Sequence, residues 1–271
     1  MSREQPFFEF PSSGWKRDLP LPDDSPEAIH GSIQGDNTPN SINQTFMELS
    51  TKTIIMRGIV GWLGLVLITL GFASIIMFIT LENLAAAGFW EHIVQSAIII
   101  GSFWAGLFML RSELHLPRDE PIRFNRARRK VYAYRYKRDW KRPFSRSAWG
   151  VEISIYDWEN LRAEACEAYG ALGTGGSIQK INLSVVKPGT REFTDRFIFA
   201  HNIYQGEEAW SMTQLFMQQG PEALPEFQGL PRNRNTERSL LNVFWRFAPK
   251  VQWPEHIDIE SRTAPTPGEQ Q

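Results

Sequence analysis

A dense basic stretch, RFNRARRKVYAYRYKRDWKR, runs from Arg123 to Arg142 and contains ten Lys and Arg residues. Cations at this density can bind nucleic-acid phosphates, bind anionic lipid headgroups or fix the orientation of a membrane protein. Alternation in the second half places Tyr132, Tyr134 and Tyr136 on one face of a strand and most nearby cations on the other. Stacking on single-stranded nucleic acid needs rings and cations on the same side. We therefore expect no nucleic-acid partner.

Four cations of this stretch are candidates for contact with a membrane surface. Arg126, Arg128, Arg129 and Lys130 follow soon after a long apolar run. A cation close to an anionic leaflet gains about 1 kcal/mol. We predict that these four side chains contact membrane lipids and that the fold does not depend on them.

Residue types used in catalysis and metal binding are scattered through the chain. The five histidines form no HExxH or other metal-spaced group. Cys166, the one cysteine, has no evident base near it that would activate a thiol. The segment GTGGSIQK, Gly173 to Lys180, lacks the ending of a phosphate loop and leads into a strand. We therefore expect no enzyme activity, no metal site and no cofactor.

The composition indicates a membrane unit joined to one folded domain. The 271 residues carry a formal net charge of −1, which excludes a chain that is basic throughout. Hydrophobic residues make up 42% of the chain, enough for helices in lipid and a modest core. A single cysteine excludes an intrachain disulfide and suits a reducing cytosol.

Two uncharged runs predict a transmembrane hairpin at residues 51–111. We expect its helices at about 58–81 and 93–110, because crossing the hydrocarbon takes roughly 20 apolar residues. The first run starts too far into the chain for a cleaved signal peptide. Neither run contains a charged side chain, so a transport path is not expected.

Cations flank only the outer ends of this hairpin. Lys52 and Arg57 precede the first helix, and Arg111 begins a cation-rich stretch after the second. The connection from Glu82 to His92 has no Lys or Arg. The positive-inside rule then predicts a multi-pass protein of the bacterial inner membrane with both termini in the cytoplasm.

Small residues predict close packing of the helices. Gly58, Gly61 and Gly64 share one helix face, and Gly71 follows one heptad later. Such positions let helix backbones approach one another. The approach would occur either within the hairpin or between the protomers of a homo-oligomer.

The remaining chain divides into an arm, a domain and a tail. Residues 1–50 are rich in proline and predict a largely irregular cytoplasmic arm, although the aromatic residues of PFFEFPSSGW should fold back onto the domain. Residues 117–259 indicate a cytoplasmic α+β domain with a mainly antiparallel sheet. Residues 260–271 predict a disordered tail.

Periodicity predicts the elements of the domain. KVYAYRYKR, WGVEISIYDW, IQKINLSVV and EFTDRFIFA alternate as strands, and a type II turn at residues 187–190 joins the last two. A helix is expected after Asp157, because Trp158, Leu161 and Ala165 fall on one stripe while Glu164 faces water. GEEAWSMTQLFMQQGP and the stretch that follows Thr236 predict two further helices.

Several segments together resemble a family of uncharacterised bacterial proteins that have two membrane helices and a cytoplasmic domain. The segments are RFNRARRKVY after the hairpin, WENLRAE, TDRFIFA and AWSMTQLFMQQGPEALP. The resemblance covers residues 51–249. Some members of that family are encoded beside type VI secretion effectors.

The resemblance implies an inner-membrane immunity protein that binds and sterically blocks a type VI secretion toxin. Almost no chain lies outside the membrane in the predicted topology, so a cognate toxin would bind on the cytoplasmic side. The alternative is a membrane-anchored scaffold, or a module that binds anionic lipid, with no toxin partner.

Overall fold

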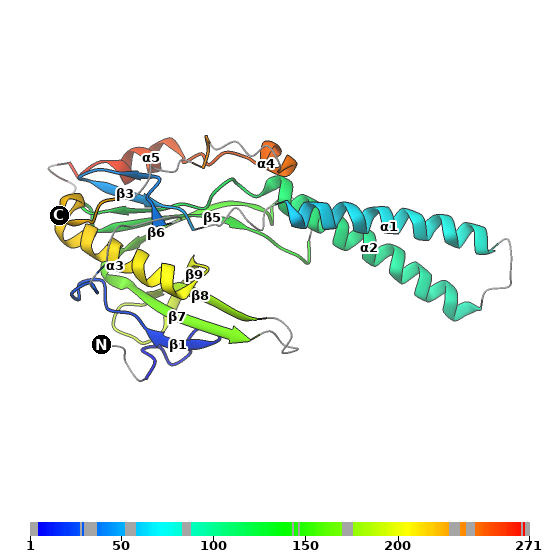
Figure 1. Ribbon diagram of the computed structural model, residues 1–271, viewed down its shortest axis with the longest axis horizontal. Helices are drawn as coiled ribbons and strands as arrows, with labels where there is room; N and C mark the ends of the chain where they lie inside the picture. Colours follow the sequence, from blue (N-terminus) through cyan, green and yellow to red (C-terminus); the bar gives the residue numbers. More distant parts are fainter. Residues whose placement is uncertain are drawn as a thin grey trace.

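The structure, a computed structural model, joins a helical hairpin to one end of a domain that contains two antiparallel sheets (Figure 1). This arrangement confirms the predicted order of two apolar helices and a β-rich domain. Apart from the side chains of residues 81 and 82, the structure describes residues 5–27, 29, 37–51, 58–82, 88–142, 144–145, 147–169, 176–227, 234–236, 242–266 and 268.

The hairpin consists of α1 (Ile59–Glu82) and α2 (Phe89–His115), and both helices are long and apolar enough to cross a membrane. Helix α1 matches its predicted bounds closely, whereas α2 is longer at both ends. Its last turns pack against the start of α1, where Glu113 is buried and its carboxylate accepts a hydrogen bond from the Gly58 amide at 2.8 Å. Lys52 and Arg57 lie outside the described residues.

The larger sheet has the order β2-β3-β4-β5-β6, with every neighbouring pair antiparallel. In its register Glu48 lies opposite Arg123, and Tyr132 lies opposite Ile155. The two strands predicted around residues 130–157 are confirmed. The strands are β2 (Ser41–Ile42), β3 (Phe46–Leu49), β4 (Ile122–Asn125), β5 (Lys130–Lys137) and β6 (Gly150–Asp157).

The smaller sheet has the order β1-β7-β8-β9 and is also antiparallel. The predicted turn between its last two strands is confirmed, because Gly189 has φ +77° and the Thr190 amide donates to the Lys187 carbonyl at 3.1 Å. The strands are β1 (Trp15–Asp18), β7 (Leu161–Tyr169), β8 (Ser177–Val186) and β9 (Phe193–Ala200).

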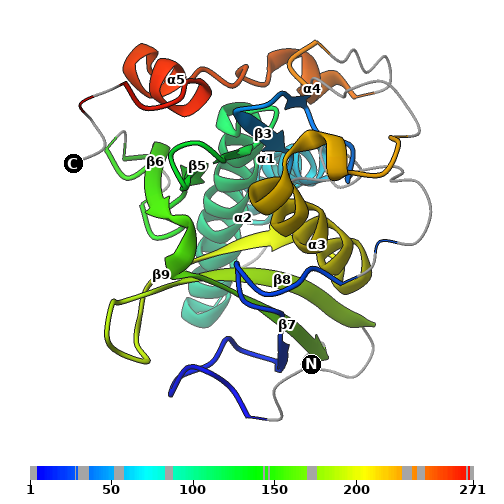
Figure 2. The ribbon, with the colours of Figure 1, turned by 90° about the vertical axis from the view of Figure 1, so that its left-hand side faces the viewer.

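Helix α3 (Ile203–Gln219) packs against both sheets and completes the core (Figure 2). The indole rings of Trp158 and Trp210 lie 5.2 Å apart at the centre of this core. Gly220, at φ +96°, ends α3 as predicted, and the 3-10 turn Pro221–Ala223 follows. The core therefore joins residues that are far apart in the sequence.

The prediction of a helix after Asp157 is wrong. The chain makes only a 3-10 turn, Trp158–Asn160, and then continues as strand β7 between β1 and β8. Hydrogen bonding to strands on both sides replaces the helical pattern, and Glu164 is fully buried where a water-facing side chain was expected. Gly170, the expected end of that helix, lies outside the described residues.

The N-terminal arm is more ordered than expected. It contributes β1, β2 and β3 to the two sheets. Phe8 is buried beside the Phe193 ring at 6.1 Å, and Ser12 bonds to Glu164 on the outer face of β7. This packing agrees with the expected folding back of PFFEFPSSGW.

The C-terminal segment covers the outer face of the larger sheet. It contains α4 (Val243–Phe247) and α5 (Glu255–Arg262), and α5 lies where a disordered tail was expected to begin. The tail prediction is therefore wrong for residues 260–262, because Ser261 is fully buried and Glu260 accepts a hydrogen bond from the Tyr132 hydroxyl at 2.9 Å. Residues 237–241, within the expected preceding helix, lie outside the described residues.

Candidate functional site

The four cations predicted to contact lipid lie at the turn between β4 and β5, and they have contacts within the chain. Arg129 pairs with Asp23 at 2.7 Å and with Glu159 at 2.6 Å. The Arg128 guanidinium donates to the Thr263 carbonyl at 3.0 Å. Lys130 lies 3.7 Å from the Glu260 carboxylate, and Arg126 lies beside Gly220.

The position of this turn bears on the lipid prediction. Strand β5 runs from the turn back toward the hairpin, so its length of eight residues separates the two by about 25 Å at about 3.3 Å per residue. The turn is thus at the end of the domain opposite the hairpin (Figure 1). Lipid contact by Arg126, Arg128, Arg129 and Lys130 stays a prediction, and this position does not favour it.

The four glycines predicted for helix packing all lie at close contacts. A Cβ atom added at Gly64 would be 2.9 Å from the Gly106 carbonyl of α2, and one at Gly71 would be 3.0 Å from the Phe103 ring. The nearest groups at Gly61 and Gly58 are the side chains of Phe244 and Asn242, which belong to the C-terminal segment. The helix interface therefore extends into the domain.

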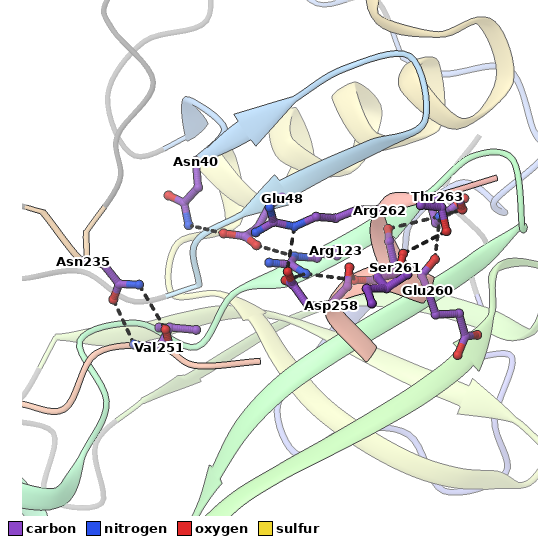
Figure 3. A network of polar contacts seen from close by, with 12 residues as sticks. Asn40, Glu48, Arg123, Asn235, Val251, Asp258, Glu260, Ser261, Arg262 and Thr263 are labelled. Carbon is purple, nitrogen blue, oxygen red and sulfur yellow. Dashed lines mark hydrogen bonds and ion pairs between the residues drawn. The ribbon is translucent and has the colours of Figure 1, made fainter. Parts of the chain in front are cut away.

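A polar cleft of about 500 Å³ lies between β3, β4 and the C-terminal segment. At its base Arg123 is buried and donates to Glu48 at 2.5 Å and to Asp258 at 2.6 Å. The guanidinium also donates to the Ser261 hydroxyl at 2.8 Å and lies 4.3 Å from the centre of the Trp253 ring. Figure 3 shows how Arg123 connects the sheet to α5.

A second acid in the cleft, Asp119, is 1% exposed. It accepts hydrogen bonds from Asn40 at 3.0 Å, from Ser50 at 2.8 Å and from the Glu120 amide at 2.8 Å. Burial raises the pKa of Asp119 to about 6, and the nearby charge of Arg234 and these hydrogen bonds oppose that rise. Asp119 is therefore an acid that titrates close to neutral pH.

The charges of this cleft are arranged to hold its walls together. Glu48, Asp119 and Asp258 face Arg123, Arg234 and Arg262, so acids and bases are balanced. Arg123 donates from Nε and Nη1 to side chains of the fold, which ties the sheet to α5. Sequence reasoning missed this cluster, because its members come from four separate segments with no motif spacing.

The outer face of β7 carries a second buried polar cluster. Glu164 accepts hydrogen bonds from the Ser12 amide at 3.0 Å, from the Ser12 hydroxyl at 2.9 Å and from the Ser184 hydroxyl, and it pairs with Arg196 at 3.2 Å. Cys166 lies nearby, where burial raises the pKa of its thiol. A raised pKa disfavours the thiolate that a nucleophile needs.

Other candidate groups from the sequence are not brought together. Among the residues that the structure describes, no group of three or more His, Cys, Asp and Glu side chains could hold a metal ion. The first residues of GTGGSIQK lie outside the described ranges, and Ser177 to Lys180 belong to strand β8.

Comparison with protein families finds a match over much of the chain. The family described as "Family of unknown function (DUF6708)" matches residues 99–265, which is more than half of the chain. The matched region begins within α2 and includes strands β4 to β9 of the two sheets. It also includes α3, α4 and α5. No curated protein and no solved structure matches the chain.

Proposed function

Because the chain belongs to DUF6708, a family whose description names no activity, we propose from its geometry that it is a membrane-anchored module that binds another protein. In its most specific form this is an inner-membrane immunity protein that binds and sterically blocks a type VI secretion toxin on the cytoplasmic side. An exposed edge strand and a rigid domain support binding, and the toxin is the partner that the sequence resemblance suggests.

The exposed edge strand β6 is the observation that carries the proposal. Within the described residues β6 pairs with β5 and has no strand on its other side. Val151 and Ile155 on this strand are 45% and 39% exposed. Proteins usually protect a long apolar edge with charges, proline or a covering segment, because such an edge can pair with another chain. Between Val151 and Ile155 the one charged side chain of β6 is the exposed Glu152. A partner can therefore add a strand here.

The C-terminal segment covers β5 and leaves β6 uncovered. It covers the tyrosine face of β5, where Tyr132 bonds to Glu260 and the Tyr134 ring lies 5.3 Å from the Trp253 ring. Val151 and Ile155 lie on the same face, opposite Tyr136 and Tyr132 in the register. The cover does not extend over them, so an apolar strip remains beside the edge of the sheet.

The polar clusters favour a role in binding over one in catalysis. Arg123 holds α5 on the sheet, and Glu164 holds the N-terminal arm on β7. Both groups use their hydrogen-bonding atoms on the fold itself, which rigidifies the domain. A rigid domain that presents an open edge loses little entropy when a partner docks, and occlusion of the partner's site would then be the mechanism.

Aromatic residues at both ends of the hairpin support insertion in a membrane. Trp62 and Trp104 are partly exposed at the end near the domain, and Phe89 and Trp90 are exposed at the far end. Trp90 and Arg111 of α2 are separated by about 30 Å of helix rise at about 1.5 Å per residue, close to the thickness of the hydrocarbon. Tryptophan is favoured at both membrane interfaces.

The test is co-expression of the effector encoded beside this gene with three forms of the full chain, scoring growth and pull-down. The wild type should protect and bind. The double variant Val151→Lys with Ile155→Lys should lose both, because charges on an edge block strand addition. Ile178→Lys, at an exposed apolar position of β8 in the other sheet, is the matched control and should behave as wild type.

Each outcome separates the proposals. Loss of protection in the edge variant, with its near-ultraviolet circular dichroism intact, supports binding through β6. Protection by all three forms would place the partner elsewhere on the domain. If the wild type neither binds nor protects, the immunity proposal fails, and the scaffold or anionic-lipid-binding alternative without a toxin partner replaces it.

A further inference from the structure

We propose that two segments at the base of the hairpin form a collar that sits in the membrane interface and binds anionic phospholipid headgroups. The inference rests on insertion of α1 and α2 in a membrane, and it does not require a toxin partner. One segment is the connection between β5 and β6, and the other is α4. The collar is defined by Trp140, Lys141, Phe144, Val243, Arg246 and Phe247.

The β5–β6 connection is attached to α2 by aromatic contacts. The Phe144 ring lies 5.7 Å from the Trp104 ring, and the ring of Trp149, just before β6, lies 5.5 Å from the Phe108 ring. The Arg111 guanidinium donates to the Ser145 carbonyl at 2.9 Å. The connection therefore lies along α2 where the apolar run ends, between Trp104 and Arg111.

Helix α4 is attached to the beginning of α1. The Phe244 ring lies 5.8 Å from the Trp62 ring and packs on Gly61, where a Cβ atom would be 2.6 Å away. The side chain of Asn242 caps α4 by accepting from the Trp245 amide and lies beside Gly58. Figure 1 shows α4 at the base of the hairpin. The two collar segments thus contact α1 and α2 at the end of the hairpin that is near the domain.

The exposed side chains of the collar are apolar rings and cations. Trp140, Phe144 and Phe247 are 64%, 62% and 66% exposed. Exposed Lys141 and Arg246 lie beside them in the chain. Large exposed rings are unfavourable in water, whereas rings combined with cations match a layer of anionic headgroups above hydrocarbon. Continuity with the apolar hairpin selects lipid as the occupant of this surface.

The level of the contacts agrees with this occupant. Trp104 lies about 10 Å along the helix from Arg111, at about 1.5 Å per residue. A headgroup layer is about 5 to 8 Å thick on each side of the hydrocarbon. If Arg111 sits among the headgroups, Phe144, which touches Trp104, reaches the upper part of the acyl chains.

The first experiment measures lipid contact at single labelled positions in the full chain. Cys166→Ser removes the native thiol, and a fluorophore is attached after Trp140→Cys, Phe144→Cys or Phe247→Cys. The protein is placed in nanodiscs of phosphatidylcholine and phosphatidylglycerol in equal parts. Lipids with a spin label near the headgroup should quench these three labels, and soluble iodide should quench them weakly.

Two control labels separate the collar from the hairpin. A label after Ile76→Cys, exposed on α1, should be quenched by spin labels deep in the acyl chains. A label after Tyr204→Cys, exposed on α3, should be quenched by iodide alone. If the collar labels are quenched by iodide alone while the label at position 76 is quenched by lipid, the collar proposal is overturned and insertion of the hairpin stands. The collar surface would then face water or another protein. A position 76 label without lipid quenching would overturn both.

The second experiment tests the charges by counting lipids that remain bound after purification from the same nanodiscs. The variant Lys141→Gln with Arg246→Gln should reduce the preference for phosphatidylglycerol by about fivefold for each cation removed. The control, Arg128→Gln with Lys130→Gln, alters the distant β4–β5 turn and should leave that preference unchanged. A loss in the control but not in the collar variant would overturn the proposal.

Discussion

Asp119 is the residue whose ionisation should shape the pH dependence of stability. Burial raises its pKa to about 6 in the folded chain, from an ordinary value of 3.8. The folded state therefore holds a proton that the unfolded state has already lost between about pH 4 and 6. The stability that this proton contributes is fully present below about pH 4 and is lost as the pH rises to about 6. The loss in the free energy of unfolding is about 3 kcal/mol.

The variant Asp119→Asn should remove this dependence. We expect the free energy of unfolding of the wild type to fall relative to that of the variant between about pH 4 and 6, and the difference to be constant above that window. Denaturant unfolding of the full chain in detergent micelles, followed by near-ultraviolet circular dichroism, measures the difference. Parallel curves for the two proteins would contradict the assignment.

Glu164 is the acid whose removal should cost most. It is fully buried, accepts hydrogen bonds from Ser12 and Ser184, and pairs with Arg196. Glu164→Ala removes the acceptor shared by the Ser12 amide, the two hydroxyls and Arg196, which keeps its hydrogen bonds to Ser184 and Phe10, so we expect a loss of about 3 to 5 kcal/mol in the free energy of unfolding.

A matched control for this change lies on the same strand. Glu167 pairs with the exposed side chain of Lys16 at 2.7 Å and accepts hydrogen bonds from Ser177 and Gln179 near the end of the strand, so Glu167→Ala should cost much less than Glu164→Ala because water screens this group. The same denaturant measurement compares the two variants. Equal losses would show that the cluster around Glu164 contributes little beyond an ordinary surface pair.

At the scale of elements, the sequence predicts strands where tyrosine and β-branched residues alternate, and it fails where alanine and glutamate fill a strand. Both faces of β5 are buried, with Val131 toward the core and Tyr132 under the C-terminal segment. Both faces of β7 are buried as well, since the core covers one face and the N-terminal arm covers Glu164 on the other. Its alanine and glutamate residues favour a helix locally, and pairing with distant β1 and β8 overrides that preference.

The prediction of a disordered C-terminal tail also failed where that tail was expected to begin. Helix α5 is too short to be stable alone, and its order depends on the ion pair between Arg123 and Asp258 and on the buried hydroxyl of Ser261. Those partners lie more than a hundred residues apart, so no local pattern reveals them. The first residues of the expected tail, 260–262, are therefore part of the fold.

The packing of α1 against α2 should depend on Gly64. A Cβ atom there would be 2.9 Å from the Gly106 carbonyl and 3.0 Å from the Leu110 amide, both of which are backbone atoms that cannot turn away. Gly64→Ala should therefore push the helices apart and lower the free energy of unfolding by about 1 to 3 kcal/mol.

Gly101 supplies the control for this change, because a Cβ atom at that position has open space around it. Gly101→Ala should be neutral or slightly stabilising, since alanine favours a helix over glycine by about 1 kcal/mol. Thermal melting of both variants in detergent measures the effect. A loss at Gly101 as large as that at Gly64 would show that helix contacts in solution differ from those in the hairpin described.

For the whole molecule, the sequence predicted the family of the chain more successfully than it predicted which cations lie near the hairpin. Membership of an uncharacterised family is confirmed by the match over residues 99–265, whereas the link to type VI secretion stays a prediction. Arg126 to Lys130 are near the hairpin in sequence, yet β4 leads the chain away from it before the turn. Strand direction, which composition does not reveal, decides which cations are near a membrane.

The strand pairing of the domain restricts the membrane topology. Residues before the hairpin pair with residues after it, since β1 pairs with β7 and β3 pairs with β4. Both parts must therefore lie on the same side of any membrane that α1 and α2 cross. Because Lys and Arg are concentrated at that end of the hairpin, we predict that the side is the cytoplasm.

Reporter fusions to the full chain test this prediction. A green fluorescent protein fused after Gln271 should fluoresce, and alkaline phosphatase at the same point should be inactive, because it folds only on the oxidising side. Alkaline phosphatase inserted between α1 and α2 should be active. Activity after Gln271 would place the domain on the opposite side of the membrane. Inactive phosphatase at both points would mean that the hairpin does not cross, and membrane anchoring would then have to be abandoned together with the lipid-binding collar that depends on it.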